Sequence, residues 1–324
     1  MNCPNCQIAI LPTDRFCEEC GTSLSEDSLP DQTQGCSKCG ALPIDIDAEG
    51  YCSNCGFRNH ANNSDRFEVL ISSQLAGVCD RGLKHRQNED FLALQTIENL
   101  HSHLMIVCDG VSSSQTPELA SQTAAKTSCE VLCESLIQGI TTEDAIRVAI
   151  ASSLKAVSAI PHKPSINADP PSTTIVMTVV KDNVATIGWL GDSRAYWIAP
   201  SLQNSQQLTV DDSWLTDMVK SGKMSEDEAI RSPNAHAITN WLGADVKDSA
   251  EPSIINFSIP AEAGYLLLCT DGLWNYVPDA SQIFALVQQA SIFTAEAISR
   301  HLVDFARSRG GHDNITVAVL STST

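Results

Sequence analysis

The chain has 324 residues, 43% of them hydrophobic, which allows one large domain with a sizeable core and an additional small module. Its 39 acidic residues outweigh 20 Lys and Arg, and the formal net charge of -19 disfavours nucleic acid and anionic lipid as partners. The N-terminal residues lack a secretory signal pattern, and no apolar stretch approaches the about 18 residues that span a bilayer. We therefore expect a cytoplasmic protein that binds neither nucleic acid nor membrane.

Four Cys-x-x-Cys pairs lie within the first 55 residues and account for eight of the 13 cysteines. Ten residues separate the first two pairs and twelve separate the last two, enough for a hairpin that brings two pairs around one tetrahedral ion. Four thiolates suit zinc, and residues 1–58 resemble a double zinc ribbon with two structural Zn²⁺ ions. The predicted zinc ligands are Cys3, Cys6, Cys17, Cys20, Cys36, Cys39, Cys52 and Cys55.

Two other uses of these cysteines stay open. A disulfide framework would need an oxidising compartment, for which the chain carries no export signal, and four thiolates also suit iron in a rubredoxin-like site. Acidic residues outnumber basic ones in this module, so a structural or protein-facing role is favoured over nucleic acid binding. Residues 59–66 are polar and aperiodic, which predicts a linker before a large domain over residues 67–324.

The large domain begins with short apolar runs and long helical patterns. The run Leu104–Cys108 predicts a buried strand. A helix is expected over Pro117–Gln138, because proline suits the first helical turn and the following Gly139 suits a C-terminal stop. Two further runs, Thr174–Val180 and Val184–Leu190, are separated only by Lys-Asp-Asn, which predicts a hairpin and therefore antiparallel pairing.

The last strongly apolar run, Tyr265–Cys269, predicts another buried strand and is followed by Thr-Asp-Gly. The remaining expected helices are Thr142–Ile160, Ser213–Ser221, Ser225–Arg231, Ser281–Gln289 and Ala295–Ser308. Antiparallel strand pairs with long helices between them favour an α+β fold of helix-covered sheets over a doubly wound parallel sheet.

Acidic residues stand at the ends of five predicted strands. A single Asp-Gly after a strand is a common turn signal, and that interpretation stays open for each instance alone. Turn chemistry does not need so many carboxylates, however, and clustered carboxylates repel one another unless cations neutralise them. A site for Mg²⁺ or Mn²⁺ is therefore expected. The residues concerned are Glu89 with Asp90, Asp109, Asp169, Asp271 and Asp313.

Six motifs follow one another along the large domain: Asn-Glu-Asp, Cys-Asp-Gly, Ser-Thr-Thr, Gly-Asp-Ser-Arg, Cys-Thr-Asp-Gly-Leu and Gly-Gly-His-Asp-Asn-Ile-Thr. In this order they resemble the metal-dependent Ser/Thr protein phosphatases of the PPM, or protein phosphatase 2C, family. The resemblance covers about residues 70–321 and implies an α-β-β-α sandwich of two antiparallel sheets, with a metal cleft at their edge. It also implies phosphorylated proteins as substrates and attack by metal-activated water.

The resemblance further implies roles for individual residues. Asp109 would bridge two Mn²⁺ or Mg²⁺ ions, and the carbonyl of Gly110 would bind one of them. Asp271 and Asp313 would complete the other site, while Glu89 and Asp90 would hold metal or its waters. Asp169 corresponds to the position that binds a third, weaker metal. Ser193 is given no nucleophilic role, and Asp192 with Arg194 is interpreted as a structural turn and ion pair.

Three residues depart from the family pattern. His85 stands where an arginine usually holds the substrate phosphate, with Arg86 beside it, so either residue could take that role, or His85 could merely pack beside the cleft. Val111 replaces a residue able to donate a proton, and Asn240 replaces a frequent arginine. The first hypothesis is an active phosphatase whose zinc ribbons serve docking or regulation. The alternative is a catalytically weak adaptor, a pseudophosphatase that binds phosphoproteins without turnover.

Overall fold

The computed structural model describes residues 40–42, 45, 53, 54, 65–165, 168–235, 237–246 and 251–322. The chain divides into two units, Met1–Ala61 and Asn62–Thr324. The eight cysteines of the predicted zinc ribbons lie outside the described residues, as does most of the predicted linker. The architecture below is that of the second unit.

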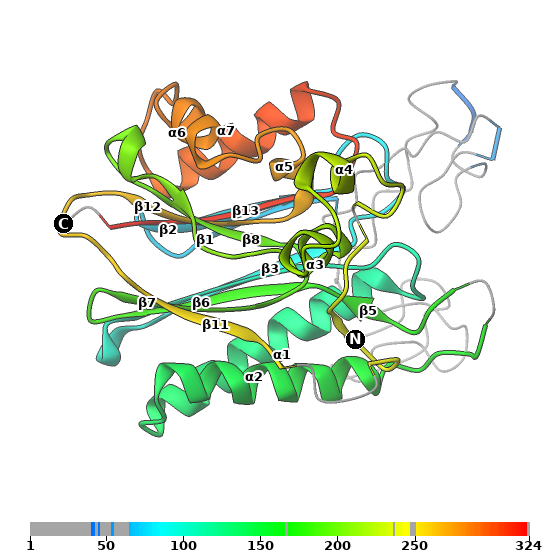
Figure 1. The fold of residues 1–324 in the computed structure, drawn as a ribbon, viewed down its shortest axis with the longest axis horizontal. Helices are drawn as coiled ribbons and strands as arrows, with labels where there is room; N and C mark the ends of the chain where they lie inside the picture. Colours follow the sequence, from blue (N-terminus) through cyan, green and yellow to red (C-terminus); the bar gives the residue numbers. More distant parts are fainter. Residues whose placement is uncertain are drawn as a thin grey trace, which may run out of the picture. The chain divides into compact units, whose positions relative to one another are not determined.

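Two antiparallel sheets form the centre of this unit (Figure 1). The first has the order β1 (Arg66–Leu70), β2 (Leu75–Asp80), β13 (Ile315–Ser321), β12 (Tyr265–Cys269), β8 (Arg194–Ile198) and β9 (Gln206–Gln207). The second has the order β11 (Ser253–Ser258), β7 (Val184–Leu190), β6 (Ile175–Lys181), β4 (Ser102–Asp109) and β3 (Asp90–Ile97). A separate short pair joins β5 (Ser172–Thr173) to β10 (Leu242–Gly243). The predicted antiparallel α+β fold is therefore confirmed.

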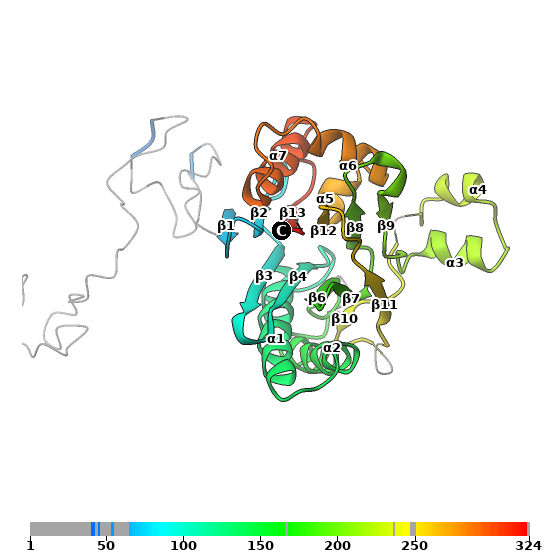
Figure 2. The same ribbon diagram turned by 90° about the vertical axis from the view of Figure 1, so that its left-hand side faces the viewer.

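Helices cover the outer face of each sheet, giving four layers (Figure 1). The helices α1 (Pro117–Ile137) and α2 (Thr142–Ser158) lie on the second sheet, and α5 (Asp271–Trp274), α6 (Ala280–Val287) and α7 (Ala295–Ser308) lie on the first. The short helices α3 (Trp214–Lys220) and α4 (Glu226–Ile230) project sideways from the sandwich (Figure 2). We call residues 213–231 the α3–α4 segment. Single 3-10 turns follow β3 (Glu98–Leu100) and β8 (Leu202–Asn204).

The continuous apolar run of β12 is explained by cores on both of its faces. Leu266 and Leu268 point into the core between the two sheets, whereas Leu267 and Cys269 point into the core beneath α6 and α7. Side chains alternate along a strand, so a strand buried on both sides has no polar positions. Each fully buried leucine contributes about 1.5–3 kcal/mol. A third core lies between the second sheet and the helices α1 and α2.

The predicted element boundaries are confirmed where local chemistry sets them. Pro117 occupies the first turn of α1, and Gly139 follows its end with φ +81°, a conformation in which glycine is unstrained. The β6–β7 hairpin turns through Asp182 and Asn183, with φ 51° and 59°, as a type I′ turn requires. Among the described residues, no helix combines the length and apolarity needed to cross a bilayer.

Candidate functional site

Four of the predicted acidic residues meet at one end of the sandwich. Asp90 begins β3 and lies directly opposite Asp109, which ends β4. Asp271 follows β12 as the first residue of α5, and Asp313 precedes β13, the antiparallel neighbour of β12. The two pairs come from different sheets. Hydrogen bonds between Asp90 and the first sheet join them.

Asp90 is held by two threonines and leaves one oxygen without a partner. Its Oδ2 accepts hydrogen bonds from the hydroxyls of Thr270 and Thr316, each 2.8 Å long, and both threonines are fully buried. Its Oδ1 is buried and has no hydrogen-bond partner. Burial is the largest cause that raises the pKa of Asp90 to about 7, and the charge of Asp313 raises it further, against the lowering effect of both threonine bonds.

Asp109 and Asp271 share this electrostatic environment. Burial raises the pKa of Asp109 well above its usual value, and the charges of Asp90 and Asp271 add to the effect. Burial likewise raises the pKa of Asp271, with Asp313 and Asp192 contributing next. Buried carboxylates that oppose one another's ionisation are stabilised in the charged form by a nearby cation.

These acids are neighbours rather than a closed ligand cage. Among the described residues, no group of three or more His, Cys, Asp or Glu side chains is already arranged around one point as metal ligands. The donors nevertheless fit a hard divalent cation, because carboxylate oxygens are what Mg²⁺ and Mn²⁺ prefer and the unpartnered Asp90 Oδ1 needs a partner. The observed arrangement therefore suits binding that draws the carboxylates together.

Both Asp-Gly pairs need glycine because of close packing. A Cβ at Gly110 would lie 2.5 Å from the carbonyl oxygen of Pro117, and one at Gly272 would lie 1.8 Å from that of Asn314. Neither glycine has a positive φ. The open interpretation of these pairs as ordinary turns is thus wrong: they are the points where α1 and α5 approach neighbouring backbone.

Asn314, to which sequence analysis assigned no role, fastens the acidic loop before β3. Its Oδ1 accepts from the Glu89 amide at 2.8 Å, and its Nδ2 donates to the carbonyls of Arg81 and Gln87 at 2.8 and 3.1 Å. The side chain is 2% exposed. Its place in the Gly-Gly-His-Asp-Asn motif, directly after Asp313, was the available signal.

A serine-rich segment after Gly110 contacts the two remaining predicted acids. The Ser112 hydroxyl donates to Glu89 Oε2, and the Ser113 hydroxyl donates to Asp169 Oδ2 at 3.4 Å. The backbone of Asp169 pairs with Ser113 and Gln115, and its side chain is exposed. Glu89 is half-buried and adjoins Asp90 in the chain, whereas Asp169 lies on the surface beside the serine segment.

His85 lies beside the acidic cluster. Its Nε2 is 3.2 Å from Asp313 Oδ1, and its carbonyl accepts a hydrogen bond from Arg81 Nη1. Arg86 is exposed. His85 therefore has a direct contact with one of the predicted metal ligands.

Asp192 belongs to the cluster, which sequence analysis missed. Arg194 pairs with Asp211 rather than with Asp192, through bonds of 2.9 and 2.7 Å. Burial is the largest cause that raises the pKa of Asp192 to about 7, with Asp211 and Asp313 also raising it. The expected Asp192–Arg194 ion pair is thus wrong. Asp192 follows the end of β7, so the strand-terminus signal that identified the other acids applied here too.

Comparison with known proteins supports one family for the second unit. A protein phosphatase 2C model matches residues 81–307, and a double zinc ribbon model matches residues 3–62. The chain is 25% identical over 245 residues to the serine/threonine phosphatase stp of Listeria innocua, covering 74% of this chain and 92% of that protein. It is 28% identical over 253 residues to the protein phosphatase PhpP of Streptococcus pneumoniae, covering 76% and 97%. The solved serine/threonine phosphatase of Staphylococcus aureus shares the fold, with a TM-score of 0.65, 23% identity and coverage of 80% and 98%.

Proposed function

Because this chain belongs to the protein phosphatase 2C family, we propose that it is a metal-dependent phosphatase that acts on phosphoserine and phosphothreonine in proteins. The observation that carries the proposal is the cluster of carboxylates at one end of the sandwich, with the buried Asp90 Oδ1 unpartnered and the pKa values of Asp109 and Asp271 raised. These oxygen donors suit two Mn²⁺ or Mg²⁺ ions. The names of the two relatives as phosphatases support the substrate class.

The proposed ligand roles divide the cluster between two ions. Asp109 would be shared by both ions, the Gly110 carbonyl would help to hold one of them, and Asp271 and Asp313 would hold the other. Asp90 would offer its unpartnered Oδ1, since its Oδ2 is already bonded to two threonines. Glu89 would hold metal or its waters.

A third, weaker ion has two candidate ligands. Asp169 is the residue that the family resemblance indicates, but its side chain is exposed and contacts Ser113. Asp192 is half-buried and close enough to Asp271 to raise the pKa of that residue. Activity measured against Mn²⁺ concentration for Asp169→Asn and Asp192→Asn decides between them. Loss of the true ligand should shift the low-affinity part of the activation curve to higher Mn²⁺ concentration, and loss of the other residue should leave it unchanged.

The bound ions would supply an activated water and clamp the phosphoryl oxygens for in-line attack. The chain's own part is to mount the carboxylates on rigid strand ends and fix the acidic loop through Asn314. Ser193 takes no nucleophilic part, since it is 1% exposed and its hydroxyl bonds to that of Thr174 at 2.9 Å. Val111 offers no proton to the leaving group, which leaves that step to water or to another group of the site.

His85 is the proposed phosphate-binding residue, supported by its contact with Asp313 at the edge of the cluster. Replacing it with alanine is expected to raise the KM for a phosphopeptide, whereas Arg86→Ala is expected to leave it near the wild-type value. A large increase in KM for Arg86→Ala alone would reverse this assignment.

The decisive experiment assays the purified chain with p-nitrophenyl phosphate and with a phosphothreonine peptide, each with and without Mn²⁺. We expect Mn²⁺-dependent turnover that Asp271→Asn lowers by at least about a hundredfold, since it removes a ligand carboxylate. If the folded protein hydrolyses neither substrate at saturating Mn²⁺, the proposal is wrong. Phosphopeptide binding in such protein would favour the adaptor alternative.

We also propose that residues 1–58 form a double zinc ribbon with two structural Zn²⁺ ions, joined by residues 59–66 to a catalytic domain over residues 67–324. The zinc ribbon model over residues 3–62 and the division of the chain after Ala61 support this organisation. The ribbons would serve docking or regulation through protein partners. An affinity capture experiment with the full chain and a Cys17→Ser variant tests this role, because partners of the ribbon should be lost from the variant.

A further inference from the structure

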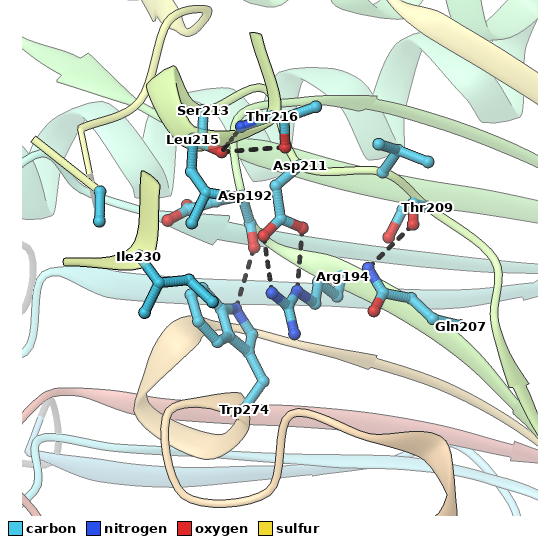
Figure 3. A pocket seen from close by; sticks show the side chains of 12 residues that line it. Asp192, Arg194, Gln207, Thr209, Asp211, Ser213, Leu215, Thr216, Ile230 and Trp274 are labelled. Carbon is cyan, nitrogen blue, oxygen red and sulfur yellow. Dashed lines mark hydrogen bonds and ion pairs between the residues drawn. The ribbon is translucent and has the colours of Figure 1, made fainter. Parts of the chain in front are cut away.

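A cavity of about 380 Å³ adjoins the carboxylate cluster beneath the α3–α4 segment (Figure 3). Asp192, a member of the cluster, lines it. Trp274 also lines it and lies three residues after Asp271 on the same short helix, α5. The cavity therefore borders the proposed site of phosphate hydrolysis through Asp192.

The floor of this cavity is a rigid stack of Arg194 on Trp274. The guanidinium carbon lies 3.8 Å from the centre of the indole ring. Arg194 is fixed by two bonds to Asp211, of 2.9 and 2.7 Å, and by a 3.1 Å bond to the Tyr196 hydroxyl. The Trp274 indole N–H donates to the Asp192 carbonyl at 2.9 Å. Each guanidinium nitrogen and the indole nitrogen already donates to an acceptor, and the carboxylate of Asp211 offsets the charge of Arg194, so the floor is poorly suited to an acidic group.

The polar groups on the walls satisfy one another in the same way. The Gln207 side-chain amide donates to the Thr209 carbonyl at 2.9 Å, and the Ser213 hydroxyl bonds to that of Thr216 at 3.0 Å. Away from the Asp192 carboxylate, a ligand in the cavity therefore gains little by offering hydrogen bonds.

The remaining wall is apolar and comes from the α3–α4 segment. Leu215 and Ile230 lie on one side of the cavity, opposite Gln207 and Thr209 (Figure 3). Ile230 is 55% exposed, so its side chain has apolar surface that an occupant would cover. Removing apolar surface from water is the main favourable contribution available here.

We propose that this cavity binds an apolar side chain of the phosphoprotein substrate, close in sequence to the phosphorylated residue. The inference rests on the proposed phosphatase function and adds a substrate class to it: phosphoserine or phosphothreonine flanked by leucine, isoleucine or phenylalanine. A polypeptide is the occupant because it can place its phosphate at the carboxylate cluster and a neighbouring side chain in the adjoining cavity. The α3–α4 segment projects from the sandwich (Figure 2), and its exposed Ile230 borders the cavity, where such a chain can reach it.

The test uses phosphothreonine peptides in which alanine surrounds the phosphoresidue and leucine is placed at one flanking position at a time. Leucine at one or two positions is expected to raise kcat/KM about tenfold, the effect of burying part of one apolar side chain. The double variant Leu215→Ser, Ile230→Ser is expected to reduce this leucine-to-alanine ratio to near one. Ile292→Ser, which changes an exposed isoleucine between α6 and α7, is the matched control and should keep the ratio.

The outcomes separate this inference from the proposed function. Equal kcat/KM for all peptides in an active protein overturns the cavity assignment and leaves the phosphatase function standing, and so does a leucine preference that survives in the double variant. If the protein hydrolyses no substrate, the phosphatase proposal fails, and the cavity is then tested by fluorescence anisotropy with labelled peptides. Tighter binding of the leucine peptide, lost in the double variant, supports the cavity assignment; equal binding refutes it.

Discussion

At the scale of single residues, the site depends on side chains that touch no substrate. Thr270 and Thr316 both donate to Asp90 Oδ2, and the Thr316 hydroxyl oxygen also lies 3.1 Å from Cys79 Sγ. These contacts set the rotation of the Asp90 carboxylate and so direct Oδ1 away from the threonines. A buried carboxylate with fewer hydrogen-bond donors would ionise less easily, and its oxygens would be less well oriented toward a metal ion.

Thr316→Val should weaken Mn²⁺ binding about tenfold, because a hydrogen bond that orients a metal ligand is lost. It should also lower the free energy of unfolding by about 1–3 kcal/mol, since a buried acceptor loses a donor. Thr316→Ser keeps the donor and should keep the Mn²⁺ affinity. Isothermal titration of the zinc-loaded chain with Mn²⁺ measures the first effect and urea unfolding the second.

A matched control is Thr178→Val in β6, where an equally buried hydroxyl donates to the Thr186 carbonyl at 3.1 Å. It should lower stability by a similar amount and leave Mn²⁺ affinity unchanged. Wild-type Mn²⁺ affinity in Thr316→Val would show that Asp90 is oriented by other contacts.

At the scale of elements, the short helix α5 is positioned by backbone contact with the residues before β13. The Gly272 α-carbon faces Asn314, and a Cβ there would also lie 3.1 Å from the α-carbon of Ile315. Asp271 starts this helix and Asp313 precedes that strand, so the close packing sets the separation of two proposed ligands.

Gly272→Ala should therefore separate α5 from β13, lower the free energy of unfolding by more than about 3 kcal/mol and abolish turnover, since overpacking against backbone cannot relax by side-chain rotation. Gly139→Ala is the comparison. A Cβ there meets no atom within 4 Å, so the only cost is the strain of an alanine at a φ of +81°. Its expected loss is about 1 kcal/mol with activity retained. Urea midpoints followed by tryptophan fluorescence give the comparison, and equal losses in the two variants would contradict the packing argument.

At the scale of the whole molecule, the proposed function gives the two units different metal chemistry. Thiolates select zinc, whereas carboxylates select Mn²⁺ or Mg²⁺. Elemental analysis should find about two zinc ions per chain that survive mild EDTA treatment, while the same treatment removes activity and added Mn²⁺ restores it. Cys17→Ser should lower the zinc content and leave turnover of p-nitrophenyl phosphate near wild type. A loss of turnover in that variant would mean that the ribbons contribute to catalysis.

The sequence by itself determined the longer helices, the central strands β4, β6, β7 and β12, the fold class and most of the acidic cluster. Periodicity and end signals are local, which is why Ala295–Ser308 and Tyr265–Cys269 have the predicted bounds. The acids were found because strand ends bring their residues to a common edge, and Asp90, Asp109, Asp271 and Asp313 do meet there. The order of six motifs identified the family before any contact was known.

Only the tertiary structure decided how individual residues are used. Arg194 pairs with Asp211, 17 residues away, and not with the adjacent acid, because pairing depends on which strands and loops face each other. The same dependence brings Thr270 and Thr316 to Asp90 across 180 and 226 residues, and places Leu215 and Ile230 over Trp274. Local sequence patterns carry no information on such contacts, since their partners are joined by packing and not by the chain.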